Sequence, residues 1–228
     1  TRSWAADAES LRSNVVASFG AAGTNVELCC TENNSVAGIP GKQTTSLVNG
    51  LYLADSLGQI LQTAFASFLW WDLHNAADAG GNNSAALYGW RGFGDYGITD
   101  SADPAGPRYP VFRAAELASV FAQPGDRIVP VTSDCPLLSA YAAVGADASL
   151  SLLVVNKSPS ATLAADFVLS GAAMNPNAVV YSYGMAQDNA ANPADPSYNT
   201  NLSGVARSSL GVGGAGFSRG FAPYSMTV

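Results

Sequence analysis

The fold is decided by VELCCT, at residues 26–31, and by AFASFLWW, at residues 64–71. Both runs are short and apolar almost throughout, which is typical of strands buried in a parallel sheet. Between them, apolar residues recur at intervals of three and four from residue 42 to residue 61, a spacing that predicts a helix with one buried face. The order strand, helix, strand implies two parallel strands linked by a crossover.

Two further helices are predicted around this unit. Residues 4–19 place apolar side chains at helical spacing before Gly20, and residues 109–121 do the same further along the chain. The segment 76–106 is rich in Gly, Asn, Ala and Asp and is too long for an ordinary connector. Loops of this length are usually functional or disordered.

Beyond Pro124 and Gly125 the pattern changes to short strands separated by turns. The predicted strands are at residues 148–156, 163–169, 177–183 and 221–228. This spacing fits an antiparallel β-sandwich. We therefore predict two domains, at residues 1–125 and 126–228, with a boundary between residues 123 and 128.

A pair of parallel strands needs further strands, because alone it exposes both apolar faces and its unpaired edges. We expect the missing part to be an N-terminal barrel or sheet portion of the same polypeptide, as a separate chain or as missing sequence. Thr1, with neither an initiator Met nor a signal peptide around it, looks like an internal start.

Composition excludes several classes of function. The net charge is −7 and the basic residues are scattered, so nucleic acid is not expected as a partner. No apolar stretch is long enough for a membrane span. One His and no CxxC spacing argue against a metal site, and no cofactor is predicted. Cys29 and Cys30 are expected to be small buried hydrophobes, and with Cys135 they allow at most one disulfide.

Polar and aromatic residues follow both predicted strands. Glu32 comes directly after the first, and Trp70, Trp71, Asp72 and His74 come at the end of the second. In a (β/α)8 barrel this edge is the catalytic face, and indole rings with polar neighbours suit sugars. Two plainer readings stay open, since a Glu at a strand end is often a loop carboxylate and a Trp pair in an apolar strand is often core.

The motifs resemble a known group of enzymes. TENNSV at 31–36, PGKQTTSLVNGL at 40–51 and FLWWDLHN at 68–75 are similar to the seventh- and eighth-strand region of clan A retaining glycoside hydrolases. The nearest likeness is to the α-L-arabinofuranosidase-like family 51, with families 39, 44 and 30 related. GDYG at 94–97 and PYSMTV at 223–228 extend the likeness to the end of the chain.

The resemblance implies the C-terminal part of a (β/α)8 TIM barrel, strands 7 and 8 with their helices, followed by a β-sandwich. It makes Glu32 the nucleophile. At the strand ends and in the long loop we predict the residues that bind substrate, with the plainer reading open that Trp90 only holds its loop in place: Trp70, Trp71, Asp72, His74, Asn34 and Trp90. The expected substrate is a plant cell-wall polysaccharide or oligosaccharide, and the expected location is secreted, extracellular or periplasmic.

A retaining mechanism needs a second carboxyl about 5 Å from the first. The resemblance puts that acid/base on the fourth strand, which this chain lacks. Asn33 also departs from the family pattern, which has Tyr after the Glu to orient it. An alternative is therefore a non-catalytic carbohydrate-binding or structural β-sandwich module with an inactive barrel remnant.

Overall fold

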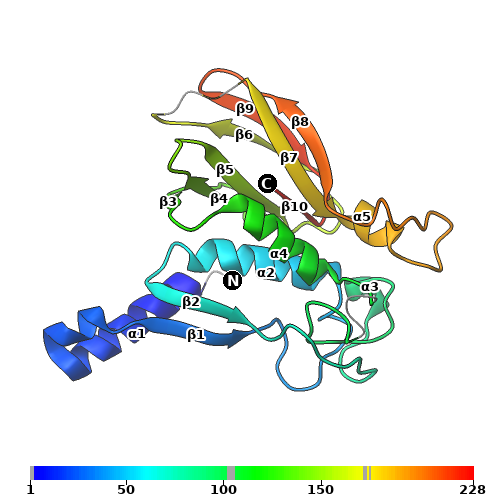
Figure 1. Cartoon of the computed structure of the whole chain (residues 1–228), viewed down its shortest axis with the longest axis horizontal. Helices are drawn as coiled ribbons and strands as arrows, with labels where there is room; N and C mark the ends of the chain where they lie inside the picture. Colours follow the sequence, from blue (N-terminus) through cyan, green and yellow to red (C-terminus); the bar gives the residue numbers. More distant parts are fainter. Residues whose placement is uncertain (1–2, 102–105, 172–173, 175) are drawn as a thin grey trace.

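The computed structural model describes residues 3–101, 106–171, 174 and 176–228. Its first part contains α1 (Trp4–Phe19), the 3-10 helix η1 (Gly20–Asn25), β1 (Leu28–Asn33), α2 (Leu47–Ile60), β2 (Phe65–Trp70), α3 (Ala85–Tyr88) and α4 (Pro110–Phe121). Its second part contains β3 (Arg127–Val129), β4 (Leu138–Val144), β5 (Leu150–Asn156), β6 (Leu163–Val168), β7 (Asn177–Gly184), α5 (Met185–Ala190), β8 (Ala206–Gly211), β9 (Gly216–Phe221) and β10 (Ser225–Thr227) (Figure 1).

The predicted parallel pairing of the first two strands is confirmed. β1 and β2 form a two-stranded parallel sheet in which Leu28 is paired with Phe65 and Asn33 with Trp70. α2 forms the crossover between them, and the Ser46 side chain caps its start by accepting a hydrogen bond from the Asn49 N–H. The described residues form no closed barrel.

The predicted burial of this sheet is wrong for the chain as it stands. Cys29 is exposed, Cys30 is half-buried, and Leu69 keeps 53% of its surface exposed. The physical reason is that this sheet has only two strands in the described chain, so only part of its apolar surface is covered. All three cysteines are free thiols.

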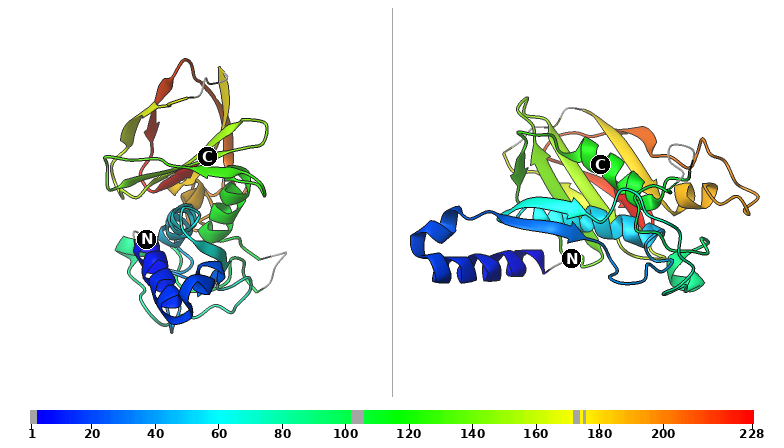
Figure 2. Two further views of the ribbon diagram at one scale, coloured as in Figure 1. Left: turned by 90° about the vertical axis from the view of Figure 1, so that its left-hand side faces the viewer. Right: turned by 60° about the horizontal axis from the view of Figure 1, so that its bottom comes forward.

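α1 lies where the spacing predicts it, but its apolar face is largely uncovered. Only Ala8 is buried, while Leu11 and Phe19 are 44% and 66% exposed. Trp4, at the start of the helix, packs edge-on against Phe65 and Phe68 of β2. α1 is also held by Arg12, whose guanidinium donates to the carbonyls of Gly23 and Val26, and it extends beyond the sheet (Figures 1 and 2).

The second part is built from antiparallel strands in two groups. A six-stranded sheet has the order β3-β4-β5-β10-β7-β8, and β6 pairs with β9 in a separate two-stranded sheet. The C-terminal strand β10 lies between β5 and β7 and pairs with both. The predicted sandwich and the division into domains at residues 1–125 and 126–228 stay predictions.

The main core lies between the two parts, where α2 and α4 are sandwiched between the β1–β2 pair and the six-stranded sheet (Figures 1 and 2). Its buried side chains include Leu51, Leu117, Phe121, Leu153 and Met226. Two glycines on α2 allow the close approach. A Cβ at Gly50 would lie 2.8 Å from the Pro110 carbonyl oxygen, and one at Gly58 would overlap the ring of Tyr141.

Candidate functional site

The carboxyl ends of β1 and β2 meet at one edge, because the strands are parallel. The backbone N–H of Trp71 donates a 3.0 Å hydrogen bond to the carbonyl of Asn33, which ties the two strand ends together. Every residue predicted to act in the site, except Trp90, lies within a few sequence positions of Asn33 or of Trp71. The topology thus brings together residues that are about forty positions apart in the sequence.

Glu32 is exposed at this edge. Its neighbour Asn33 turns toward the helix layer, where Asn33 Nδ2 donates to the hydroxyl of Tyr52 on α2 at 3.3 Å. The pairing of β1 with β2 shifts register between Cys30 and Asn33, so strand alternation does not assign a face to Glu32, which is exposed. In a complete (β/α)8 barrel the helices are outside, and the face away from them is the interior.

Asn34 is a structural tie as well as a predicted substrate contact. Its Nδ2 donates to the carbonyl of Trp71 at 2.6 Å, and its Oδ1 accepts from the backbone N–H of Ser35 at 2.7 Å. The same oxygen accepts from Asn49 Nδ2, on α2, at 3.2 Å. Asn34 therefore fixes the loop after β1 relative to both β2 and α2.

The two tryptophans at the end of β2 have different environments. The Trp70 ring packs against Tyr52 and Phe68 with centroid distances of 6.2 and 6.5 Å, and its Nε1 is buried without a partner among the described residues. Trp71 is 49% exposed. The alternation along the strand thus leaves Trp71 as the indole that an incoming ligand can reach.

Asp72 and His74 follow on the same segment. The backbone N–H of Asp72 donates to the carbonyl of Tyr96, and the Asp72 carbonyl accepts from the backbone N–H of Ile98. These two hydrogen bonds hold the segment against the long loop. Burial, and then the negative charge of Asp95, raise the pKa of the Asp72 carboxyl above its usual 3.8. His74 is exposed.

Asp95 is a buried residue to which the sequence assigned no role, although it belongs to the GDYG motif. Its carboxylate accepts from the Gly97 N–H at 2.8 Å and from the Tyr109 hydroxyl at 3.2 Å, and its own N–H donates to Thr44 Oγ1. Burial raises the pKa of Asp95. Asp95 thus joins the long loop to the starts of two helical segments.

Trp90 is fixed by the C-terminal part of the chain. Its Nε1 donates to the carbonyl of Asp188 on α5 at 3.1 Å, and the Arg91 guanidinium lies 4.2 Å from its ring centroid. Arg91 also forms a buried ion pair with the Asp188 carboxylate at 2.8 Å. No local pattern predicts this contact, because the two residues are 97 positions apart.

Buried polar atoms without partners concentrate at this edge. Of eight such side-chain atoms among the described residues, five lie here, namely Asn33 Oδ1, Ser35 Oγ, Asn49 Oδ1, Trp70 Nε1 and Asp72 Oδ1, and three lie elsewhere, namely Ser56 Oγ, Arg113 Nε and Arg219 Nε. Buried polar groups are almost always hydrogen-bonded, so such a concentration indicates further polar partners, from a ligand, water or more polypeptide. The part of the chain that the structure describes has no group of three or more His, Cys, Asp or Glu residues able to hold a metal ion.

Comparison with known proteins shows the fold. No protein-family model and no curated protein sequence matches the chain. An α-L-arabinofuranosidase from Thermotoga maritima in complex with arabinose superposes with a TM-score of 0.64 at 17% identity, covering 99% of this chain and 48% of that one. A Paenibacillus polymyxa xyloglucanase of glycoside hydrolase family 44 gives 0.63 at 20% identity, covering 96% and 34%. A family 30 endoxylanase from Clostridium papyrosolvens gives 0.55 at 14% identity, covering 90% and 41%.

The chain thus shares its fold with the C-terminal regions of clan A glycoside hydrolases, and it spans less than half the length of these structures. At these identities the likeness shows the fold alone, and membership of the clan stays a prediction. Because families 51, 44 and 30 are all represented, the nearer likeness to family 51 stays a prediction. No helix in the described ranges combines the length and apolar character of a membrane span.

Proposed function

We propose that the chain is the C-terminal part of a retaining glycoside hydrolase, comprising strands 7 and 8 of a (β/α)8 barrel with their helices and a β-sandwich, and that Glu32 is its nucleophile. One observation carries the proposal. Glu32 is exposed at the carboxyl end of a parallel strand, beside the matching end of β2, at the edge where unpartnered polar atoms concentrate. The likeness to glycosidases in fold supports it.

In the proposed reaction, a Glu32 carboxylate oxygen attacks the anomeric carbon as the bond to the leaving oxygen breaks. A second carboxyl, contributed by the missing N-terminal part, gives its proton to that oxygen. The resulting ester between Glu32 and the sugar is hydrolysed by water, which the second carboxylate deprotonates, so the anomeric configuration is retained.

The remaining predicted substrate residues divide by exposure. Trp71 and His74 are exposed, and we propose that they contact the sugar directly. Trp70, Asp72, Asn34 and Trp90 also make protein contacts described above, so we propose that they form the wall behind the sugar. Asn33 is bonded to Tyr52, and the group that orients Glu32 therefore comes from elsewhere in the complete barrel.

The N-terminal barrel portion is the proposed partner. The exposed apolar side chains of the β1–β2 sheet, such as Leu69, are the surface that further strands of a barrel would cover. A plant cell-wall polysaccharide or oligosaccharide is the proposed substrate, and secretion to the extracellular space or periplasm would bring the enzyme to it.

The test is to co-express the chain with the N-terminal half of its own enzyme and to replace Glu32 by Gln or Ala. Loss of a nucleophile lowers kcat by about 10³-fold or more, and azide should restore turnover of an activated glycoside by Glu32→Ala with the opposite anomeric configuration. Glu27→Gln is the matched control, because Glu27 is exposed just before the opposite end of β1. Unchanged hydrolysis by both Glu32 variants would exclude the role. Binding of insoluble polysaccharide without hydrolysis by the unmutated protein would favour the alternative of a non-catalytic module.

A further inference from the structure

Asp188 lies on α5, in the C-terminal part of the chain, and holds the Trp90 ring in two ways. Its backbone carbonyl accepts a hydrogen bond from the Trp90 indole N–H at 3.1 Å. Its carboxylate is paired with Arg91 at 2.8 Å, and the Arg91 guanidinium lies 4.2 Å from the centroid of the Trp90 ring. One residue therefore fixes both the edge of the indole and the cation that packs against it.

Asp188 is in turn fixed by the six-stranded sheet. The Tyr183 hydroxyl, near the end of β7, donates to Asp188 Oδ1 at 3.4 Å. The next residue of the strand, Gly184, donates its backbone N–H to Gln187 Oε1 at 3.0 Å, and α5 begins directly after it. α5 is thus a continuation of β7, and the position of the Trp90 ring is set by the C-terminal sheet through Asp188.

The segment that carries Trp90 also contacts the loop after Glu32. The Tyr88 hydroxyl donates to Gln43 Oε1 at 2.8 Å, and Gln43 Nε2 donates to the carbonyl of Ser35 at 3.3 Å. Ser35 comes three positions after Glu32. Tyr88 belongs to α3, and α3 and α5 both lie on the side of the molecule where β1 and β2 end (Figure 1, and the right-hand view of Figure 2).

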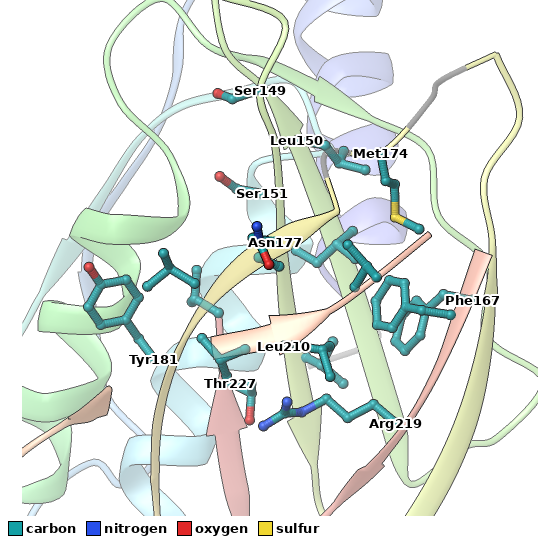
Figure 3. A pocket seen from close by; sticks show the side chains of 18 of the residues that line it. Ser149, Leu150, Ser151, Phe167, Met174, Asn177, Tyr181, Leu210, Arg219 and Thr227 are labelled. Atoms are coloured by element: carbon teal, nitrogen blue, oxygen red, sulfur yellow. The ribbon is translucent and has the colours of Figure 1, made fainter. Parts of the chain in front are cut away.

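The largest cavity of the C-terminal part does not reach this edge. It has a volume of about 670 Å³, and Figure 3 shows Leu150 of β5, Phe167 of β6 and Arg219 of β9 around it. None of its lining residues belongs to α5, to the long loop or to the carboxyl ends of β1 and β2. Within the described ranges, the hydrogen bond from Trp90 to Asp188 is the one that joins a predicted substrate residue to the C-terminal part.

We propose that Asp188 is a positioning residue for substrate binding and acts through Trp90, an inference that rests on the proposed function. The sugar meets an indole whose orientation is already set, so the cost of ordering that side chain is not incurred on binding. Trp90 belongs to the wall behind the sugar, so its contact is the same in the ground state and in the transition state. Loss of Asp188 therefore raises KM and leaves kcat nearly unchanged.

The test measures Asp188→Asn in the chain co-expressed with the N-terminal half of its own enzyme. The substrates are xylo- and arabino-oligosaccharides, and the one that the unmutated protein cleaves faster is used. Asn keeps the size and the backbone carbonyl of residue 188 but removes the charge that pairs with Arg91. We expect KM to rise about three- to tenfold and kcat to change by less than about twofold.

Two further variants show whether the effect passes through Trp90. Trp90→Ala should raise KM at least as much as Asp188→Asn, and the double variant should raise it no further, because residues that act as a unit are not additive. Arg91→Lys keeps the buried charge pair but loses the planar guanidinium beside the indole. It should raise KM in the same direction, and it replaces Asp188→Asn if that variant does not fold.

Two controls separate positioning from a loss of stability. Asp195→Asn, in the loop after α5, removes a carboxylate that is bonded to Ser197 and should leave KM unchanged. Tyr141→Phe breaks the bond to Asp55 on α2, away from Trp90, and should leave KM unchanged although the fold is weakened. Hydrogen exchange of the Trp90 indole N–H, assigned by its absence in Trp90→Phe, needs no catalysis and should be at least about tenfold faster in Asp188→Asn.

An unchanged KM in Asp188→Asn, an equal rise in Tyr141→Phe, or unchanged exchange of the indole N–H would each overturn the inference. Failure of the proposed function is a different result, namely hydrolysis that survives in Glu32→Gln and Glu32→Ala. If the unmutated protein cleaves neither substrate, the dissociation constants of xylopentaose and arabinopentaose replace KM. Equal constants for the unmutated protein and Asp188→Asn, or no binding at all, would then count against Asp188.

Discussion

The hydroxyl of Tyr141 on β4 donates a 2.6 Å hydrogen bond to Asp55 Oδ1 on α2, and so joins the helix layer to the six-stranded sheet. The pair is buried, and Lys157 Nζ lies 3.4 Å from the other oxygen of Asp55. Tyr141→Phe removes one donor from a buried carboxylate, and we expect a loss of about 1–3 kcal/mol in the free energy of unfolding, measured in urea. Tyr198→Phe, at a 49% exposed position, is the control and should change little. Equal effects would mean that the bond contributes nothing.

Breaking the ion pair between Arg91 and Asp188 should lower the free energy of unfolding more than Tyr141→Phe does. Its two side chains are only 4% and 9% exposed, and removing one partner leaves the other charged and buried. Arg91→Ala is expected to cost about 3–5 kcal/mol in chemical denaturation. Glu116→Gln breaks the Arg113–Glu116 pair, in which Glu116 is 41% exposed, and should cost less than about 1 kcal/mol. A small effect of Arg91→Ala would show that the loop is not anchored by this pair.

Gly58→Ala should destabilise the protein although Ala is the better helix former. The intrinsic gain is about 1 kcal/mol. The added methyl would overlap the Tyr141 ring, and overpacking of a core costs about 1–3 kcal/mol. We therefore expect a lower Tm by calorimetry. Gly92→Ala, where a Cβ has open space around it, is the control and should leave Tm nearly unchanged.

Alkaline pH should unfold the protein through three buried tyrosines. Burial, and then nearby carboxylates, raise the pKa of Tyr109, Tyr141 and Tyr183 above the usual 10.0. The folded state thus binds these protons more tightly than the unfolded state. Their contribution to stability is complete below pH 10 and is lost as the pH rises toward the folded pKa values. Tyrosinate absorbance for these three residues should appear together with unfolding, and ionisation while the fold stays intact would contradict this.

Asp95→Asn should lower the pKa of Asp72 without restoring the usual 3.8. Burial is the first cause of the raised pKa of Asp72 and the charge of Asp95 is the second, so the variant removes only the smaller cause. A carboxyl titration followed by NMR measures this. Asp147→Asn, in the exposed loop between β4 and β5, is the control and should leave Asp72 unchanged. Because the folded pKa is raised, the penalty from Asp72 is absent below pH 3.8 and develops as the pH rises through the folded value.

Local patterns predicted several elements whose own residues carry the signal, but they missed the apolar strand β4, LSAYAAV. The spacing at residues 109–121 gives α4, and the apolar run at 177–183 gives β7 to within one residue. The sequence ARSSLG of β8 and the sequence GFSRGF of β9 carry no such signal, since Ser and Gly do not favour strands. These strands form because β7 and β6 supply a template for pairing.

Burial was harder to predict than secondary structure, because it depends on what covers a residue. Cys29 lies in an apolar strand but is exposed, since the β1–β2 sheet has only two strands here. In the candidate site, the position of Glu32 at a strand end follows from the sequence. The contacts of Trp90 and Asp95 do not, because their partners are set by tertiary packing of distant segments.

The anchoring of Trp90 and Arg91 on α5 bears on how such chains can be recombined. A chimaera joined near residue 125 would take Arg91 from one parent and Asp188 from the other, and would likewise separate Asp55 from Tyr141. Both pairs would form in the chimaera only if the two parents happened to carry compatible residues at these four positions. A crossover that keeps residues 47–228 together preserves both pairs, but it separates Thr44 from Asp95 and Asn34 from Asn49, so a unit that keeps all of these contacts begins before residue 34.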